Sequence, residues 1–186
     1  MMDEPTVLIV PGLRDEVPEH WQSLLARRLP RVRSVPALGR RNLDCAARLA
    51  HIERSVAEIE GAVLAVAHSG GCVMLAHWAA HTRRTLRAAL LATPPDFEEP
   101  LPEGYPTLDE LAAGGWLPVP RGRLPFASIV AASRNDPLGR FERVSELARD
   151  WGSRLVDLGE VGHLNPASGF GEWRRAPELI EELSSL

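Results

Sequence analysis

A serine within a short run of small residues is the feature of this sequence that most directly indicates chemistry. Ser69 lies in the segment AHSGG, residues 67–71, which follows the apolar run 62–66 and precedes a segment of helical periodicity. A serine at such a strand-to-helix turn projects its hydroxyl above the sheet when the residues two before and two after it are small. Ala67 and Gly71 meet that condition, although the usual pattern, G-x-S-x-G, has glycine at the first position. Ser69 is therefore a candidate nucleophile.

A serine nucleophile needs a base to remove its proton and an acid to orient that base. In proteins with this turn the acid precedes the histidine in the chain, and each lies on a loop just after a strand. Asp136 follows the apolar run 126–132, and His163 follows the run 154–158. The sequence thus predicts that Ser69, Asp136 and His163 form a catalytic triad. Asp157 is the competing acid, but it lies inside the last predicted strand rather than in the loop after it.

Attack on a carbonyl carbon also creates negative charge on oxygen, which backbone N–H groups stabilise. Gly70, directly after the candidate nucleophile, offers one N–H at a helix N-terminus, where the helix dipole favours negative charge. The second donor is expected in the loop after the first strand, PGLR at residues 11–14, where Leu13 presents its N–H. The side chain of Arg14 is an alternative donor.

The histidines near the predicted site have structural alternatives. His20 precedes Trp21 at the start of the first predicted helix, so it either lines the site or caps and packs that helix. His68 is next to the candidate nucleophile but is expected to point away from it along the turn.

No metal site or cofactor is predicted. His77 and His81 have the spacing of zinc ligands on a helix, but Trp78 occupies the position where the metalloprotease motif requires glutamate. Cys45 and Cys72 are too few for a disulfide framework and do not have metal-ligand spacing, so they are expected to be buried or half-buried free thiols.

The elements that must position these residues alternate along the chain in the manner of βαβ units around a mostly parallel sheet. The predicted strands are 6–10, 32–35, 62–66, 86–92, 126–132 and 154–158, and the predicted helices are 19–29, 43–59, 70–82, 108–113, 138–151 and 177–183. Right-handed crossovers place helices on both faces of such a sheet. The expected fold is an α/β, three-layer α/β/α sandwich of about six strands, with a single domain over residues 1–186.

One segment, residues 93–125, interrupts the alternation and holds eight of the chain's 16 prolines. It begins at the carboxyl end of a strand, where open α/β sheets bind ligands. It therefore either walls a substrate pocket or only seals the edge of the sheet. The candidate pocket-lining residues are Arg14, His20, Trp21, Phe97 and Trp116.

Composition excludes several classes of partner. The net charge of −4, from 21 basic and 25 acidic residues, argues against nucleic-acid binding, and basic residues are not interleaved with aromatic ones. No apolar run approaches the roughly 20 residues needed to span a bilayer, and the N-terminus carries no charged-then-apolar leader. A cytoplasmic protein without a membrane partner is expected.

Four groups of residues resemble the small serine hydrolases of the α/β-hydrolase superfamily that include retinoblastoma-binding protein 9 and bacterial YdeN. They are VPG (10–12) followed by HW (20–21), HSGG (68–71), NDP (135–137), and GHLN (162–165) with Ser168, Gly169, Gly171 and Trp173. The resemblance covers nearly the whole chain. It implies Ser69 as nucleophile, Asp136 as acid and His163 as base, on a compact fold without a large lid domain.

The expected activity is hydrolysis of carboxylic esters with small or medium acyl groups, through an acyl-serine intermediate. Thioesterase and amidase activity remain open, because this fold hosts several chemistries. The partner is then a small-molecule ester or other acyl compound, and the sequence indicates no protein partner. The alternative is a catalytically weak α/β-hydrolase-fold protein that serves as a protein- or ligand-binding module. A flavodoxin-like phosphate binder is disfavoured, because residues 11–14 are too poor in glycine.

Overall fold

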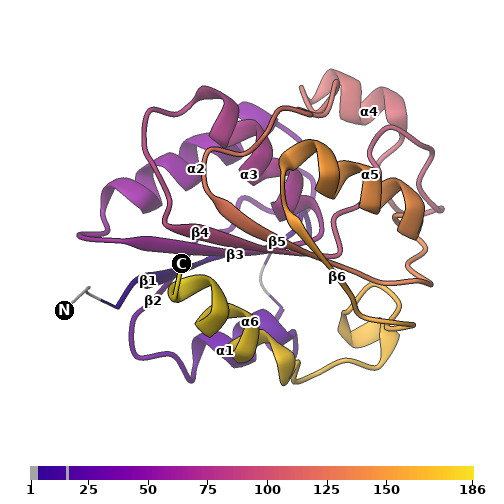
Figure 1. Cartoon of the computed structure of the whole chain (residues 1–186). Coiled ribbons are helices and arrows are strands. Elements are labelled where there is room, and N and C mark those ends of the chain that lie inside the picture. The colour runs from indigo at the N-terminus through magenta and orange to yellow at the C-terminus, as the bar shows by residue number, and fades with distance from the viewer. Residues whose placement is uncertain (1–3, 16) are drawn as a thin grey trace.

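The computed structural model describes residues 4–15 and 17–186 (Figure 1). Within these ranges six strands form one sheet, in the order β2-β1-β3-β4-β5-β6, and every neighbouring pair is parallel. The strands are β1 (Thr6–Val10), β2 (Val32–Ser34), β3 (Val63–His68), β4 (Ala88–Ala92), β5 (Ala127–Ala132) and β6 (Arg154–Asp157). The predicted α/β sheet is confirmed.

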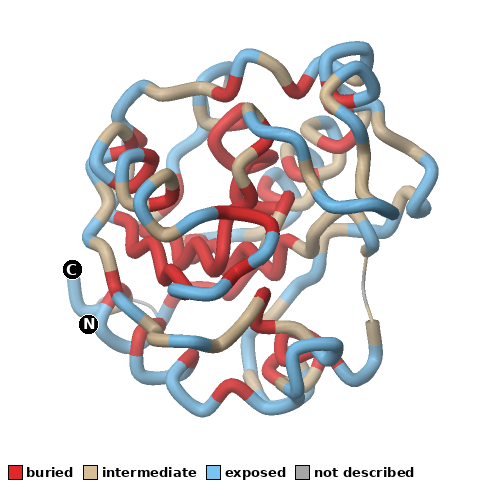
Figure 2. Tube along the Cα trace, turned by 90° about the vertical axis from the view of Figure 1, so that its right-hand side faces the viewer, coloured by how far each residue is buried: buried red, intermediate tan, exposed pale blue. Residues whose placement is uncertain are grey.

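The central strands are short, aliphatic and covered on both faces. Every residue of β1, β3 and β4 is buried, as expected for parallel strands with helices on each side. The edge strand β2 has only three residues, and two of them are exposed. Figure 2 shows the same contrast between the buried sheet and the exposed outer loops.

Helices cover both faces of the sheet, which gives the three layers (Figure 1). One face carries α1 (Trp21–Ala26) and α6 (Arg175–Ser184), and the other carries α2 (Cys45–Ala57), α3 (Gly70–His81) and α5 (Phe141–Trp151). The short helix α4 (Leu108–Ala113) lies within residues 93–125, and a 3-10 turn, η1 (Pro166–Ser168), follows β6. Helix α4 has the predicted bounds because Thr107 and Glu110 form a reciprocal capping box at its start.

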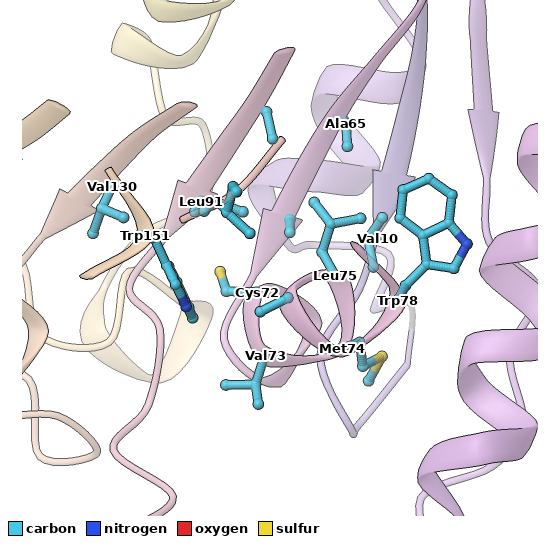
Figure 3. Close-up of a cluster of buried hydrophobic side chains, with 14 of the residues drawn as sticks. Val10, Ala65, Cys72, Val73, Met74, Leu75, Trp78, Leu91, Val130 and Trp151 are labelled. Atoms are coloured by element: carbon cyan, nitrogen blue, oxygen red, sulfur yellow. The ribbon is translucent and has the colours of Figure 1, made fainter. Parts of the chain in front are cut away.

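Helix α3 is the best buried helix, and its side chains build much of one core cluster (Figure 3). Cys72 and Leu75 of α3 belong to that cluster together with Leu91 of β4 and Trp151 of α5. Cys72 and Cys45 are buried free thiols, and burial raises the pKa of Cys45 to about 11. The helix that follows Ser69 is thus fixed by packing around most of its circumference.

Element boundaries differ from the predictions by a few residues. Strand β3 continues to His68 instead of ending at residue 66, because Ala67 and His68 still pair with neighbouring strands. Helix α5 begins at Phe141 rather than at residue 138, because the Asp136 carboxylate accepts the Leu138 N–H in a turn before the helix. Helix α6 begins at Arg175, two residues earlier than predicted. No helix in the described ranges combines the length and apolarity needed to cross a bilayer.

Candidate active site

Ser69 occupies a sharp turn between β3 and α3. Its backbone has φ 55° and ψ −132°, a positive φ that residues other than glycine seldom adopt. Gly71 permits this turn, because a β-carbon there would lie 2.4 Å from the carbonyl oxygen of Val10. The Ser69 N–H donates to the carbonyl oxygen of Ala92 at 3.0 Å. These contacts fix the serine at the carboxyl end of the sheet.

The structure brings Ser69, His163 and Asp136 into one hydrogen-bonded row. His163 Nε2 lies 2.8 Å from Ser69 Oγ, and His163 Nδ1 lies 3.0 and 2.9 Å from the two carboxylate oxygens of Asp136. Both His163 and Asp136 are buried. A carboxylate only accepts hydrogen bonds, so Nδ1 of a neutral imidazole carries the proton and Nε2 is left to accept from the serine hydroxyl. This is the protonation state that a general base requires.

Asp157, the competing acid, lies outside this row. It ends β6 with its carboxylate exposed, and one of its oxygens is 2.6 Å from the guanidinium of Arg134. The hydrogen bond from Arg134 holds the pKa of Asp157 below its ordinary value. Asp157 is therefore a partner in a surface ion pair.

The loop that carries His163 is held by side chains on both of its flanks. The Gly162 N–H donates to Asn135 Oδ1 at 2.7 Å, and the His163 N–H donates to Ser168 Oγ at 3.0 Å. Ser168 Oγ in turn donates to Asn165 Oδ1 at 2.8 Å. Gly162 has φ 57°, and a β-carbon there would lie 2.5 Å from Ser168 Oγ. The loop therefore has little freedom to displace the imidazole.

His68 contributes to the site in a way that the sequence did not reveal. Its Nε2 lies 2.9 Å from the carbonyl oxygen of His163, so Nε2–H donates and anchors the backbone of that residue. The hydroxyl of Thr93 reaches the same oxygen at 3.4 Å. The imidazole is directly behind His163, with 5.0 Å between ring centroids. His68 was expected only to point away from the serine, and the structure shows that it also holds the backbone of His163.

His20 takes both of the roles that the sequence left open. Its Nδ1 accepts the Gln22 N–H at 3.1 Å and so caps α1, and the residue also lines the cavity above Ser69. Its ring lies 4.5 Å from that of His68. Burial, followed by the nearby His163, lowers the pKa of His20 to about 4, and burial also holds the pKa of His68 well below its ordinary value. Both imidazoles are neutral at pH 7.

Leu13 and Gly70, whose N–H groups are the expected oxyanion donors, lie next to each other beside Ser69. A β-carbon at Gly70 would lie 3.5 Å from the backbone nitrogen of Leu13, so the loop after β1 packs against the start of α3. Neither N–H donates to an acceptor in the described part of the chain. Two adjacent unpaired donors next to a serine are what a developing oxyanion needs. The guanidinium of Arg14, the alternative donor, instead lies 4.6 Å from the ring centroid of Tyr105.

A cavity of about 790 Å³ opens over Ser69 and His163. Residues 93–125 form one of its walls through Pro95, Phe97, Leu101 and Tyr105. Two acidic residues of this segment anchor it on α5, because Asp96 and Glu98 form ion pairs with Arg143 at 2.7 and 3.1 Å. Of the two roles considered for this segment, the structure shows the pocket wall.

Arg14, His20 and Phe97 line the cavity, but the expectation that Trp21 and Trp116 also line it is wrong. Trp21 packs behind His20, with its ring 4.8 Å from that of Trp173. Trp116 packs behind Phe97 and donates from Nε1 to the carbonyl oxygen of Leu43. Both indoles are almost fully buried. They support the lining residues from the core.

The histidine pair on α3 makes backbone contacts. His77 Nε2 lies 3.0 Å from the carbonyl oxygen of Trp116, and His81 Nδ1 lies 2.8 Å from that of His77. Within residues 4–15 and 17–186, no group of three or more metal-binding side chains comes together.

The chain matches the model of one protein family and is similar in fold to many solved structures. The model of the family described as serine hydrolase matches residues 7–182. A YdeN-like hydrolase from Pectobacterium atrosepticum is 29% identical, with a TM-score of 0.82 over 98% of this chain and 91% of that one. The ydeN gene product of B. subtilis is 18% identical, with a TM-score of 0.77 over 98% and 100%. Est1E from Butyrivibrio proteoclasticus, solved with ferulic acid bound, is 12% identical, with a TM-score of 0.68 over 97% and 87%. No curated protein matches the chain in sequence.

Proposed function

The chain belongs to the serine hydrolase family, and from this premise we propose that it hydrolyses carboxylic esters of small or medium acyl groups with Ser69 as nucleophile. The observation that carries the proposal is the row of hydrogen bonds from Ser69 through His163 to Asp136 beneath an open cavity. A hydroxyl, a neutral imidazole and a carboxylate in this order are the groups that activate a serine.

Acylation begins when Ser69 Oγ attacks the ester carbonyl carbon and His163 Nε2 takes the hydroxyl proton. The carbonyl oxygen becomes an oxyanion, which accepts hydrogen bonds from the Leu13 and Gly70 N–H groups. Asp136 stabilises the imidazolium that has formed. His163 then gives its proton to the alcohol oxygen as the carbon–oxygen bond breaks, and the acyl group stays on Ser69.

Deacylation repeats the same steps with water. His163 removes a proton from a water molecule, whose oxygen attacks the acyl-serine carbonyl, and the Ser69 oxygen leaves with the proton that His163 returns. The products are a carboxylic acid and an alcohol. In both steps the imidazole must be unprotonated to act as the base.

The cavity supports a small or medium acyl group. Its volume of about 790 Å³ is within the range of small-molecule sites, and residues such as Leu13, Phe97 and Leu101 give it apolar surface. Ferulic acid is a small aromatic acid, and it is bound in Est1E, one of the proteins with a similar fold.

Labelling with a fluorophosphonate tests the nucleophile. We expect wild type to be labelled and Ser69→Ala to remain unlabelled. Ser145→Ala is a suitable control, because the Ser145 hydroxyl on α5 donates to the carbonyl oxygen of Phe141, outside the cavity lining. Equal labelling of wild type and Ser69→Ala would contradict the assignment.

A substrate panel tests the reaction. It consists of p-nitrophenyl esters of graded acyl length with matched thioesters and anilides. We expect the highest kcat/KM for esters, with a decline at long acyl chains. A protein that hydrolyses no member and takes up no fluorophosphonate would instead be a binding module.

A further inference from the structure

The outer part of the cavity carries more positive charge than a protein of net charge −4 would suggest. Among the described residues, three arginines line it: Arg14 in the loop after β1, and Arg40 and Arg41 in the loop after β2. All three are exposed. Within the part of the chain that the structure describes, none of them has a hydrogen bond or ion pair with an acidic group. Three guanidinium groups are therefore available at the mouth of the cavity.

The acidic residues of the described lining do not neutralise these arginines. Asp15 is bound elsewhere, because its carboxylate lies 3.3 Å from the buried guanidinium of Arg48 and accepts the Gly39 N–H at 2.7 Å. Glu110 accepts the Thr107 N–H at 2.8 Å as part of the capping box of α4. Among the described lining residues, the three arginines therefore outnumber the one carboxylate without a cationic partner, that of Glu110, and the balance of charge is positive.

Arg14 is held in place by an aromatic ring. Its guanidinium carbon lies 4.6 Å from the ring centroid of Tyr105, which belongs to the segment 93–125. A cation over a ring face is attracted by the π electrons, while its N–H groups at the edge stay free to donate. A guanidinium presents these donors in a planar fork that matches a carboxylate. The loop after β1 thus offers an oriented anion-binding group one residue beyond Leu13.

We propose that the cavity selects esters that carry a carboxylate remote from the scissile bond, such as hemi-esters of dicarboxylic acids. Arg14, Arg40 and Arg41 bind the carboxylate, while Ser69 attacks the ester carbonyl. This inference rests on the proposed function and adds the class of substrate to it.

Paired substrates of equal length test the selection. Mono-4-nitrophenyl glutarate is compared with 4-nitrophenyl pentanoate for charge on the acyl side, and 4-acetoxybenzoate with its methyl ester for charge on the alcohol side, after subtraction of spontaneous hydrolysis. We expect kcat/KM to favour the anionic member of at least one pair about fivefold, the upper range for partly exposed ion pairs. The pair that shows the preference identifies the side on which the carboxylate binds. The preference should shrink when NaCl is raised from about 50 to about 500 mM, because the Debye length, about 14 Å at the lower concentration, falls severalfold over this range.

Arginine variants test the source of the preference. The double variant Arg40→Gln/Arg41→Gln and the single variant Arg14→Gln should each lower the ratio of anionic to neutral kcat/KM, the double variant to near one. Arg83→Gln is the matched control, because Arg83 is also exposed but lies after α3, away from the cavity. It should keep the wild-type ratio.

The outcomes separate this inference from the function on which it rests. Hydrolysis of neutral esters with an anionic-to-neutral ratio of one or less in both pairs overturns the inference and leaves the ester hydrolase standing. A preference that survives in all arginine variants overturns the assignment of these residues. Absence of both hydrolysis and fluorophosphonate labelling overturns the proposed function, and the inference with it.

Discussion

The hydrogen-bonded row and the arginine-lined mouth of the same cavity are built in opposite ways. Ser69, Asp136 and His163 follow strand ends, and the acid and the imidazole are buried with their polar atoms bonded to each other. Arg14 and Arg40, in contrast, lie on loops with exposed side chains. Deleting a member of a buried polar network leaves its partners unsatisfied, whereas an exposed charge contributes little by itself. We therefore expect reaction rate to depend on the row and substrate preference to depend on the mouth.

The largest expected effect is that of His163→Ala. Loss of the proposed base should lower kcat for p-nitrophenyl butyrate on the order of 10⁶-fold, as in a comparable triad on another fold. The control His81→Ala, which removes an exposed imidazole at the end of α3, should stay within about twofold, since α3 gains only a good helix former there. Retention of more than a hundredth of wild-type kcat by His163→Ala would remove this histidine from the mechanism.

Asp136→Asn should have the next largest effect. An amide in place of the carboxylate favours the wrong tautomer of His163, which costs about 10⁴-fold in kcat in a comparable triad. Asp157→Asn is the matched control, since it removes only an exposed ion pair with Arg134. If the two variants proved equally impaired, the assignment of Asp136 as the acid of the triad would be contradicted.

The neutral imidazoles of His20 and His68 lead to a prediction about stability. The pKa of His20 is lowered to about 4, so between that pH and about 6.5 the unfolded chain binds a proton that the folded protein does not. Its contribution is fully present above pH 6.5 and is lost as the pH falls to 4, by about 3 kcal/mol at most. His20→Asn keeps a helix-capping side chain and removes the titration. Urea unfolding at pH 7.0, 5.5 and 4.5 should show a smaller loss in the variant.

Parallel loss in wild type and His20→Asn would mean that His20 is protonated within the folded protein. The pKa values of His68 and His77 are also lowered by burial, and both groups contribute to the slope, so only the difference between the two proteins is informative.

The smallest expected effect is that of Tyr105→Ala at the mouth. Removal of the ring beneath Arg14 should lower kcat/KM for the preferred anionic ester about twofold to fivefold, the strength of an exposed cation–π contact. Tyr105→Phe retains the ring face and should behave like wild type. A loss in Tyr105→Phe equal to that in Tyr105→Ala would assign the effect to the hydroxyl instead.

Features set by local sequence patterns could be predicted from the sequence, whereas features set by contacts between distant residues could not. The strands and the positions of Ser69, Asp136 and His163 follow from local patterns, because a buried strand needs aliphatic residues and the turn after it needs small ones. The role of His68 depends on a backbone oxygen 95 residues away, which no local pattern encodes.

Trp21 and Trp116 illustrate a further limit of sequence patterns. A large aromatic residue near a site can form either its wall or the core behind it, and residue type does not distinguish the two. Arg40 and Arg41 were not predicted as lining residues either, because the loop after β2 has no periodicity that fixes where its side chains lie.

The distance along the chain between Ser69 and His163 determines when the two residues can first meet during synthesis of the protein. The two residues are 94 positions apart, and His163 becomes available only after all six strands have been synthesised. Parallel strands with long crossovers pair late, because loop closure must precede their contacts. A ribosome-bound chain therefore carries Ser69 without the proposed base. Esterase activity would then appear only at the last stage of folding and would report the docking of the C-terminal segment.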